Sequence, residues 1–184
     1  MARIPYVEPE TAPTAVREVL ERLPVKLNIF KLMAHAETNF RPLLQLGTSI
    51  LAQQQLAANF RELAILRVAQ LSGAEYEWVQ HVPIARGTGV TEAQVTALRG
   101  GDVDPACFDE VERLVLRFTT EVVRDVGAAA QTFAAMQRHF SAREIVELVL
   151  AVGFYMTVAR LMETTAIDLD PPAGTAVVDS IARR

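Results

Sequence analysis

The feature that most constrains the fold of this chain is a pair of segments that are apolar on every helical face. They occupy residues 61–72, RELAILRVAQLS, and residues 147–161, ELVLAVGFYMTVARL. A helix that is apolar all round is a buried helix, since any exposed face would leave hydrophobic side chains in water. Two such helices in a chain of 184 residues predict a helical core. They also predict burial between subunits, so we expect an obligate homo-oligomer.

The remaining sequence supports an all-α fold. Hydrophobic residues make up 51% of the chain but aromatic residues only 7%, and no stretch alternates between apolar and polar residues as a half-buried strand would. We expect an extended N-terminal arm over residues 1–11, a single helical domain over residues 12–168 and a C-terminal tail over residues 169–184.

Local start and stop signals predict the positions of the helices. Thr91 and Ser141 each begin a capping box, whereas Asn28, Asn39 and Asn59 are candidate N-caps. Pro83 falls inside a helix and is expected to kink it. The expected helices cover residues 13–23, 29–36, 39–54, 59–73, 74–86, 91–99, 108–124, 129–140 and 142–165.

Charge and cysteine content exclude several classes of function. The net charge is −4 and there is no basic stripe, so we expect neither nucleic acid nor an anionic membrane as a partner. Cys107 is the single cysteine, which excludes an intramolecular disulfide. No apolar run reaches about 18 uncharged residues, and the first residues do not resemble a signal peptide. We therefore expect a cytoplasmic protein with no transmembrane span.

Three titratable residues form the candidate catalytic site. His81 follows Glu77 by four residues, so both project from one face of a helix, and a carboxylate beside an imidazole orients a general base. Glu62 lies among apolar residues on the preceding helix, where a charge needs a partner. It is either a proton-shuttling acid or a structural carboxylate held by Arg61, Arg67 or backbone donors.

Four further residues are candidates for substrate binding. Trp78 and Tyr76 flank the Glu77–His81 pair and would form pocket walls, with core packing as the alternative. Tyr155 and Arg160 lie on the last long helix, where Arg160 would hold a substrate carboxylate or form a structural ion pair. There is no glycine-rich phosphate loop and no serine nucleophile elbow, so we expect no nucleotide cofactor.

The stretch from Arg61 to His81, followed by VPIARGTGVTEAQVTAL, resembles the carboxymuconolactone decarboxylase family, which includes the AhpD-like alkylhydroperoxidases. The resemblance covers about residues 40–165. It implies an all-helical bundle that forms trimers or hexamers, with its active site on a central two-helix hairpin. Glu62 and His81 match the glutamate and the histidine of the family motif.

The two cysteines of the peroxidase motif fall on Ala74 and Glu77, so both thiols are absent. A dithiol peroxidase needs a thiolate and a resolving thiol, and that activity is therefore disfavoured. The resemblance instead points to the decarboxylase-type branch, which keeps the histidine without the cysteines.

The resulting expectation is a cofactor-independent acid/base lyase that acts on a small carboxylated lactone or a related keto or unsaturated acid. His81 would move the proton, and Glu77 or Glu62 would tune it. The alternatives are a non-catalytic oligomer that binds a ligand or a protein partner, a redox protein that uses Cys107 between subunits, and a metal site at Glu62, Glu77 and His81. We expect no metal.

Overall fold

The computed structural model describes residues 1–104, 106–174 and 176. Over these residues the chain forms nine helices and no strand, which confirms the predicted all-α class. The helices are α1 (Thr14–Arg22), α2 (Asn28–Met33), α3 (Glu37–Ala52), α4 (Ala58–Ser72), α5 (Glu75–Gly87), α6 (Glu92–Arg99), α7 (Glu110–Asp125), α8 (Ala130–His139) and α9 (Ala142–Thr165).

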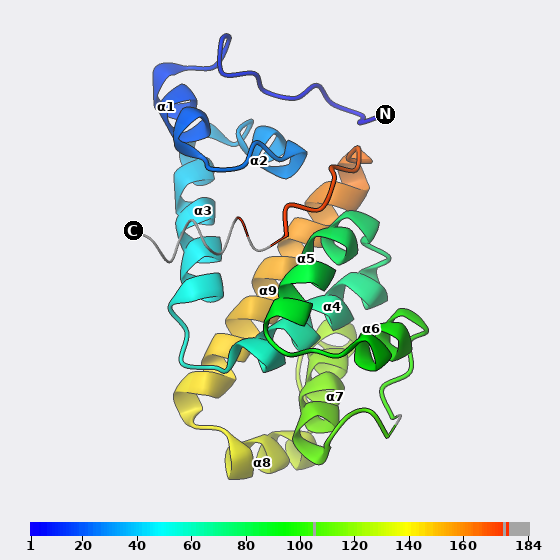
Figure 1. Cartoon of the computed structure of the whole chain (residues 1–184). Coiled ribbons are helices and arrows are strands. Elements are labelled where there is room, and N and C mark those ends of the chain that lie inside the picture. Colours follow the sequence, from blue (N-terminus) through cyan, green and yellow to red (C-terminus); the bar gives the residue numbers. More distant parts are fainter. Residues whose placement is uncertain (105, 175, 177–184) are drawn as a thin grey trace.

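Helices α4 and α9 form the centre of the molecule, as their apolar sequences predict. They pack along each other, while α5 and α7 lie against α4 (Figure 1). All nine residues from Arg61 to Ala69 are buried, so α4 is enclosed on every side. Helix α9 was predicted to be buried on every face. In the single chain it is not, because Val146, Val149 and Leu150 form an exposed apolar stripe.

The buried side chains form three hydrophobic clusters. The first joins α4 and α9 to α7 and α8, and the third joins α4 to α5, α6 and the start of α7. The second packs α1, α2 and the start of α3 against the C-terminal half of α9. Helix α3 lies along the side of the bundle (Figure 1), and a cavity lined by residues of α3, α5 and α9 holds the candidate site.

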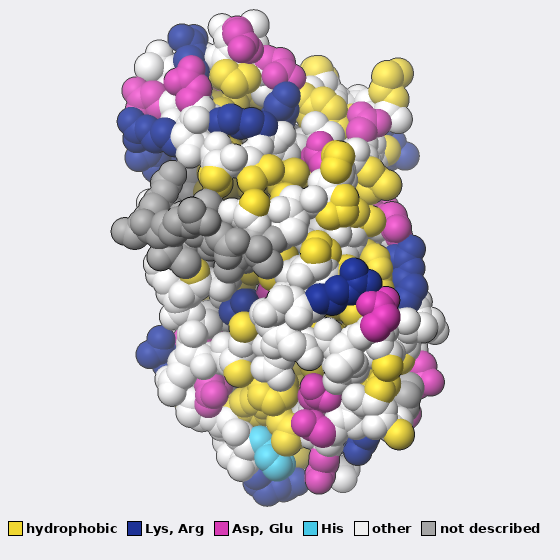
Figure 2. Space-filling model, in the orientation of Figure 1, with side chains coloured by type: hydrophobic (Ala, Val, Ile, Leu, Met, Phe, Trp, Pro, Cys, Tyr) yellow, Lys and Arg dark blue, Asp and Glu magenta, His cyan; other side chains and the backbone are white. Residues whose placement is uncertain are grey.

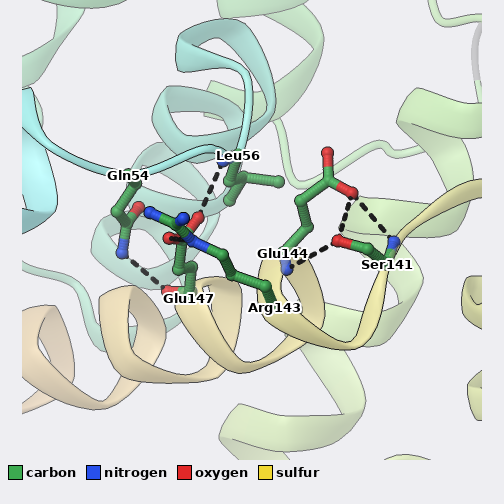
Figure 3. Close-up of polar contacts among 6 residues, drawn as sticks. All are labelled: Gln54, Leu56, Ser141, Arg143, Glu144 and Glu147. Carbon is green, nitrogen blue, oxygen red and sulfur yellow. Dashed lines mark hydrogen bonds and ion pairs between the residues drawn. The ribbon is translucent and has the colours of Figure 1, made fainter.

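The ends of α6 and α9 confirm the predicted capping boxes. Thr91 caps α6, and Ser141 caps α9 through the backbone N–H of Glu144, while the Glu144 side chain accepts from the N–H of Ser141 (Figure 3). Asp109 forms a third capping box at α7, which the sequence analysis did not identify.

The three asparagine caps were predicted wrongly. Asn39 and Asn59 lie inside α3 and α4, and Asn28 is the first residue of α2. The backbone N–H of Asn28 donates to the Asp170 carboxylate at 2.6 Å, so a residue from the other end of the chain replaces the local cap. Because α3 begins at Glu37, Pro42 lies in its interior rather than in its first turn.

The N-terminal part of α9 holds the connection between α3 and α4 in place (Figure 3). Glu147 accepts from the backbone N–H of Leu56 at 2.8 Å and from Arg143 Nε at 2.8 Å, and its own carbonyl accepts from the side chain of Gln54 at 2.9 Å. These contacts tie the residues that follow α3 to the first turns of α9.

Among the described residues, α9 alone is long and apolar enough to cross a membrane, with a mean hydropathy of 1.8 over its most apolar window. Its buried side contributes Leu148, Val152 and Tyr155 to the first hydrophobic cluster, as the core helix of a globular domain does. On the face drawn in Figure 2, acidic and basic side chains are interspersed, and hydrophobic side chains reach the surface between them.

Candidate active site

The hairpin of α4 and α5 brings the predicted residues together. Gly73 ends α4 in the left-handed conformation, with φ 64°, and α5 begins only two residues later at Glu75. A residue without a Cβ adopts this conformation at little cost, so the chain reverses within a very short turn. Pro83 lies inside α5, which continues beyond it to Gly87.

Glu62 and His81 form a buried pair across the hairpin. His81 Nδ1 lies 2.9 Å from Glu62 Oε2, and Arg61 Nε donates to Glu62 Oε1 at 3.2 Å. Glu62 is completely buried, and the other two side chains are nearly so. Each carboxylate oxygen therefore has its own cationic or N–H partner, which offsets the cost of burying the charge. The sequence left Arg61 and Arg67 as alternatives; Arg67 instead contacts Thr120 and Gln70.

This pairing determines which nitrogen of His81 is available for chemistry. A carboxylate accepts hydrogen bonds, so the neutral imidazole carries its proton on Nδ1 and leaves a lone pair on Nε2. Within the described residues, nothing forms a hydrogen bond with Nε2. The Tyr155 ring packs edge-on against the imidazole with 4.7 Å between ring centroids, and this contact limits rotation of His81.

Glu77 does not orient His81, contrary to one of the roles predicted for it. Its side chain is 2% exposed, and neither carboxyl oxygen has a hydrogen-bond partner among the described residues. Burial, reinforced by the nearby carboxylates of Glu62 and Glu163, raises the pKa of Glu77 well above its usual range. Burial therefore favours the neutral form of the Glu77 carboxyl beside the Glu62–His81 pair, because an unpaired buried charge would be far more costly.

The site opens onto a cavity of about 910 Å³ between α3 and the α5–α9 side of the bundle. Tyr76, Glu77, His81 and Tyr155 lie in its wall, and Glu62 is hidden behind His81. Burial and the nearby Glu62 carboxylate raise the pKa of Tyr155, so its hydroxyl is a donor rather than a phenolate. The rest of the lining is mainly aliphatic, as in most ligand cavities.

A C-terminal segment that follows α9 closes part of this cavity, and the sequence analysis did not identify its contacts. Gln80 donates to the carbonyls of Asp170 and Pro171 at 3.3 and 3.2 Å and accepts from the N–H of Ala173 at 3.0 Å. Tyr76 donates its hydroxyl to Asp170. The described part of the predicted tail thus folds back onto its own subunit, and residues 175 and 177–184 lie outside the described residues. No local sequence signal could link Gln80 to a segment about ninety residues away.

Two predicted substrate-binding residues lie outside the cavity. Trp78 points to the other side of α5, where it packs in the third hydrophobic cluster beneath the Arg99 guanidinium. Arg160 lies on the exposed side of α9 and donates to the carbonyl of Met156. Helical geometry accounts for Trp78, because it is only one residue from Glu77 and neighbouring positions face about 100° apart.

The donor set does not form a metal site in the described part of the chain, where no three His, Cys, Asp or Glu side chains are arranged to hold an ion. Cys107 lies in the loop before α7, is half-buried against the third cluster and does not line the cavity. Residues 74 and 77 are alanine and glutamate, so neither supplies a thiol beside His81.

Comparisons with known proteins agree with this architecture. Residues 38–121 match the model of the carboxymuconolactone decarboxylase family. Comparison with the curated proteins gives no match.

The fold is similar to that of an uncharacterized peroxidase-related protein from Ralstonia eutropha JMP134 with an AhpD core, with a TM-score of 0.78 and 18% identity over 96% of this chain and 95% of that chain. A peroxidase-related protein from Silicibacter sp. TM1040 gives a TM-score of 0.76 and 17% identity over 92% of each chain. The debrominase Bmp8, solved with a tribromopyrrole, gives a TM-score of 0.73 and 18% identity over 96% of this chain and 95% of that chain. At these identities the likeness concerns the fold. The family match covers residues 38–121, which are less than half of the chain, and the solved structures are similar to this chain in fold.

Proposed function

We propose that the protein is an acid/base enzyme of the carboxymuconolactone decarboxylase type, in which His81 moves a proton at the substrate and Glu62 holds the imidazole. The observation that carries this proposal is the 2.9 Å contact between Glu62 Oε2 and His81 Nδ1, which leaves Nε2 on the cavity side. A buried carboxylate stabilises the imidazolium that forms when Nε2 takes up a proton.

The substrate would be a carboxylated lactone or a related keto or unsaturated acid. His81 Nε2 first takes up the proton of the substrate's carboxyl group. The C–C bond to the resulting carboxylate then breaks, carbon dioxide leaves, and the electron pair stays on the substrate as an enolate, with the substrate carbonyl as the electron sink. The His81 imidazolium returns the proton to carbon, which restores the neutral imidazole. This chemistry requires neither metal nor organic cofactor.

The absence of thiols at residues 74 and 77 favours this proposal over a dithiol peroxidase. A peroxide cycle oxidises a thiolate and resolves it with a second thiol. Glu77 can donate a proton or a hydrogen bond, but it cannot be oxidised and reduced in this way. We therefore propose that the chain resembles the decarboxylase-type branch, which keeps the histidine without the cysteines.

We also propose that the protein acts as a homo-oligomer. Val146, Val149 and Leu150 are 57%, 42% and 48% exposed and repeat at helical spacing on one side of α9. Such an apolar stripe on a single chain is typical of a surface that a second subunit covers.

The state of His81 can be tested without a known substrate. In nitrogen-15 NMR spectra at neutral pH, we expect His81 to be the Nδ1-protonated tautomer, and we expect Glu62→Leu to remove this preference. A wild-type His81 that carries its proton on Nε2 would contradict the proposal, since that nitrogen could not accept a proton from the substrate.

The activity can be tested by screening carboxylated lactones and β-keto acids for release of carbon dioxide. We expect His81→Ala to lower turnover by about 10²–10⁴-fold, which is the usual contribution of a positioned acid or base. His139→Ala is the matched control, because His139 is an exposed histidine at the end of α8. If His81→Ala retains turnover within about threefold of wild type, His81 does not carry the reaction.

A further inference from the structure

A buried arginine on α4 has no acidic partner. Arg61 and Arg67 are both 5% exposed, and the Arg61 guanidinium contacts the Glu62 carboxylate. The Arg67 guanidinium instead donates to three neutral oxygens, which are Thr120 Oγ1 at 3.0 Å, Gln70 Oε1 at 2.9 Å and the carbonyl of Gly101 at 3.2 Å. Neutral acceptors do not cancel a buried charge, so Arg67 is an uncompensated cation within the described part of the chain.

One nitrogen of Arg67 remains available to a ligand. Nη2 forms no hydrogen bond with the described residues, and it is not sealed from solvent. Arg67 does not line the catalytic cavity. It follows Glu62 by five residues and therefore lies about 140° around the axis of α4 from that residue. A molecule that reaches Nη2 consequently approaches from a different side of the α4–α5 hairpin than the substrate of His81.

A second guanidinium lies beside Arg67. Arg124 follows Thr120 by four residues, so both lie on one face of α7, and Thr120 is the residue that accepts from Arg67 Nε. Burial, reinforced by the charge of Arg124, lowers the pKa of Arg67. Arg124 is exposed and forms no ion pair among the described residues. Two neighbouring cations repel each other, and a bound anion would remove this cost.

The acidic residues near this pair in the sequence do not supply that anion. Glu121 accepts hydrogen bonds from the start of α8, and Asp102 accepts from a backbone N–H of its own loop. Asp125 forms no ion pair with Arg67 or Arg124 in the described structure. The compensating charge must therefore come from a molecule that binds at this surface.

The number and kind of donors restrict the class of this molecule. Two guanidinium groups without a carboxylate are balanced by a dianion, whereas a carboxylate would leave one positive charge. Guanidinium groups suit phosphate in particular, because their N–H groups match the spacing of its oxygens. Gln70 turns its Oε1 toward Arg67, and its Nε2 has no acceptor among the described residues, so it is a further donor near Arg67.

We propose that Arg67 and Arg124 form a surface site for a compact dianion, which is inorganic phosphate or the phosphate group of a monoester. Phosphate oxygens accept from Arg67 Nη2 and from the Arg124 guanidinium, and the two negative charges balance the two cations. Because only 5% of Arg67 is exposed, the remainder of a monoester stays in solvent. This site is separate from the catalytic cavity and does not depend on the proposed function.

Titration of the full-length protein with sodium phosphate at about pH 8, where a phosphate group is a dianion, tests the site. Sodium chloride keeps the ionic strength constant, because salt screens exposed charges in any case. In carbon-detected NMR spectra of the guanidinium groups, the signals of Arg67 and Arg124 should shift along one saturating curve. Sodium acetate, which carries one charge, should bind at least about tenfold more weakly.

Methyl phosphate distinguishes the two sources of the ligand. Binding within about threefold of inorganic phosphate would support a site for monoesters, since a single hydrogen bond to the lost oxygen contributes little in water. Loss of methyl phosphate binding, with inorganic phosphate still bound, would support a site for the free ion.

Arg124→Gln separates a binding site from a structural contact. Arg124 is exposed, and its replacement leaves the hydrogen bonds of Arg67 in place. The variant should bind phosphate at least about tenfold more weakly, because it loses a charged donor. Without phosphate it should unfold at a higher temperature than wild type, because the repulsion is gone. Arg117→Gln is the matched control: Arg117 is exposed on the same face of α7, and this variant should bind phosphate within about twofold of wild type.

Four results would overturn the proposal. Signals of Arg67 and Arg124 that respond equally to phosphate and to chloride would show screening without binding. Acetate that binds as tightly as phosphate would exclude the dianion. Equal phosphate affinity in wild type and Arg124→Gln, or loss of binding in Arg117→Gln instead, would place the anion elsewhere. An Arg124→Gln variant that is less stable than wild type without phosphate would show that Arg124 supports the fold instead of repelling Arg67.

Discussion

Replacing Glu77 with glutamine should change how the stability of the protein depends on pH. In the folded protein, burial and the nearby Glu62 and Glu163 carboxylates raise the pKa of Glu77 well above its ordinary value of 4.5. In the unfolded chain, the residue returns to that ordinary value. Folding therefore retains a proton that the unfolded chain releases, whereas glutamine has no proton to release.

The sign and size of the effect follow from this difference. Below pH 4.5 both states of wild-type Glu77 bind the proton, and it makes no pH-dependent contribution. Between pH 4.5 and the raised pKa, only the folded state binds it, so the free energy of unfolding falls by about 1.4 kcal/mol per pH unit as the pH rises. Relative to wild type, Glu77→Gln should gain about 3 kcal/mol over two pH units inside this window.

Urea unfolding at a series of pH values measures the effect directly. Protein concentration must be held fixed, because association shifts apparent stability. Any constant difference between a carboxylic acid and an amide cancels, since only the slope of the difference against pH is compared. Glu75→Gln is the matched control: Glu75 lies on the same helix but is exposed and paired with Arg99.

Parallel stability curves for wild type and Glu77→Gln above pH 5 would refute the reasoning. They would mean that Glu77 ionises in the folded protein at about the same pH as in the unfolded chain. In that case Glu77 must have a partner that the described contacts do not include.

Three further predictions concern the framework of the site. Arg61→Met should lower the free energy of unfolding in urea by about 3–5 kcal/mol, because it leaves Glu62 buried without its guanidinium. The Arg61→Met, Glu62→Gln double variant should recover most of this stability. A loss below about 1 kcal/mol in Arg61→Met would contradict the pairing. Gly47→Leu should lower the free energy of unfolding by about 1–3 kcal/mol, because a Cβ at residue 47 would lie 3.0 Å from the Phe154 ring. Gly153→Ala, with open space around residue 153, should raise it by about 0.5–1 kcal/mol. Equal effects of the two substitutions in urea unfolding would refute this. Leu150→Glu should reduce the mass measured by light scattering while Arg117→Glu on α7 should not, and an unchanged mass for Leu150→Glu would exclude this stripe as the subunit contact.

The architecture was predictable because its strongest signals are local and mutually consistent. The apolar segment of α4 is buried on all sides, and the bounds predicted for α9 agree with Ala142–Thr165 because Ser141 and Glu144 form a complete capping box. The start of α2 was not predictable in the same way. Its first N–H is bound by Asp170, and no signal near Asn28 reveals a partner 142 residues away.

The sequence predicted which residues form the candidate site, but it did not predict that His81 pairs with Glu62 rather than with Glu77. The spacing of Glu77 and His81 places both on the cavity side of α5, but the partner of the imidazole comes from the neighbouring helix. Both carboxylates are buried, and Glu62 rather than Glu77 contacts His81 and Arg61 because of the way α4 and α5 pack. The roles of these residues in catalysis remain predictions.

The contact between Gly47 and Phe154 has a consequence for how related chains can diverge. Phe154 lies edge-on to Tyr155 with 5.3 Å between ring centroids, and Tyr155 in turn packs against the His81 ring. A single position on α3 is therefore joined through two rings to the imidazole. During evolution, residues 47 and 154 should consequently covary in size, and a lineage that enlarges one without reducing the other should change its substrate range and the alignment of its base together.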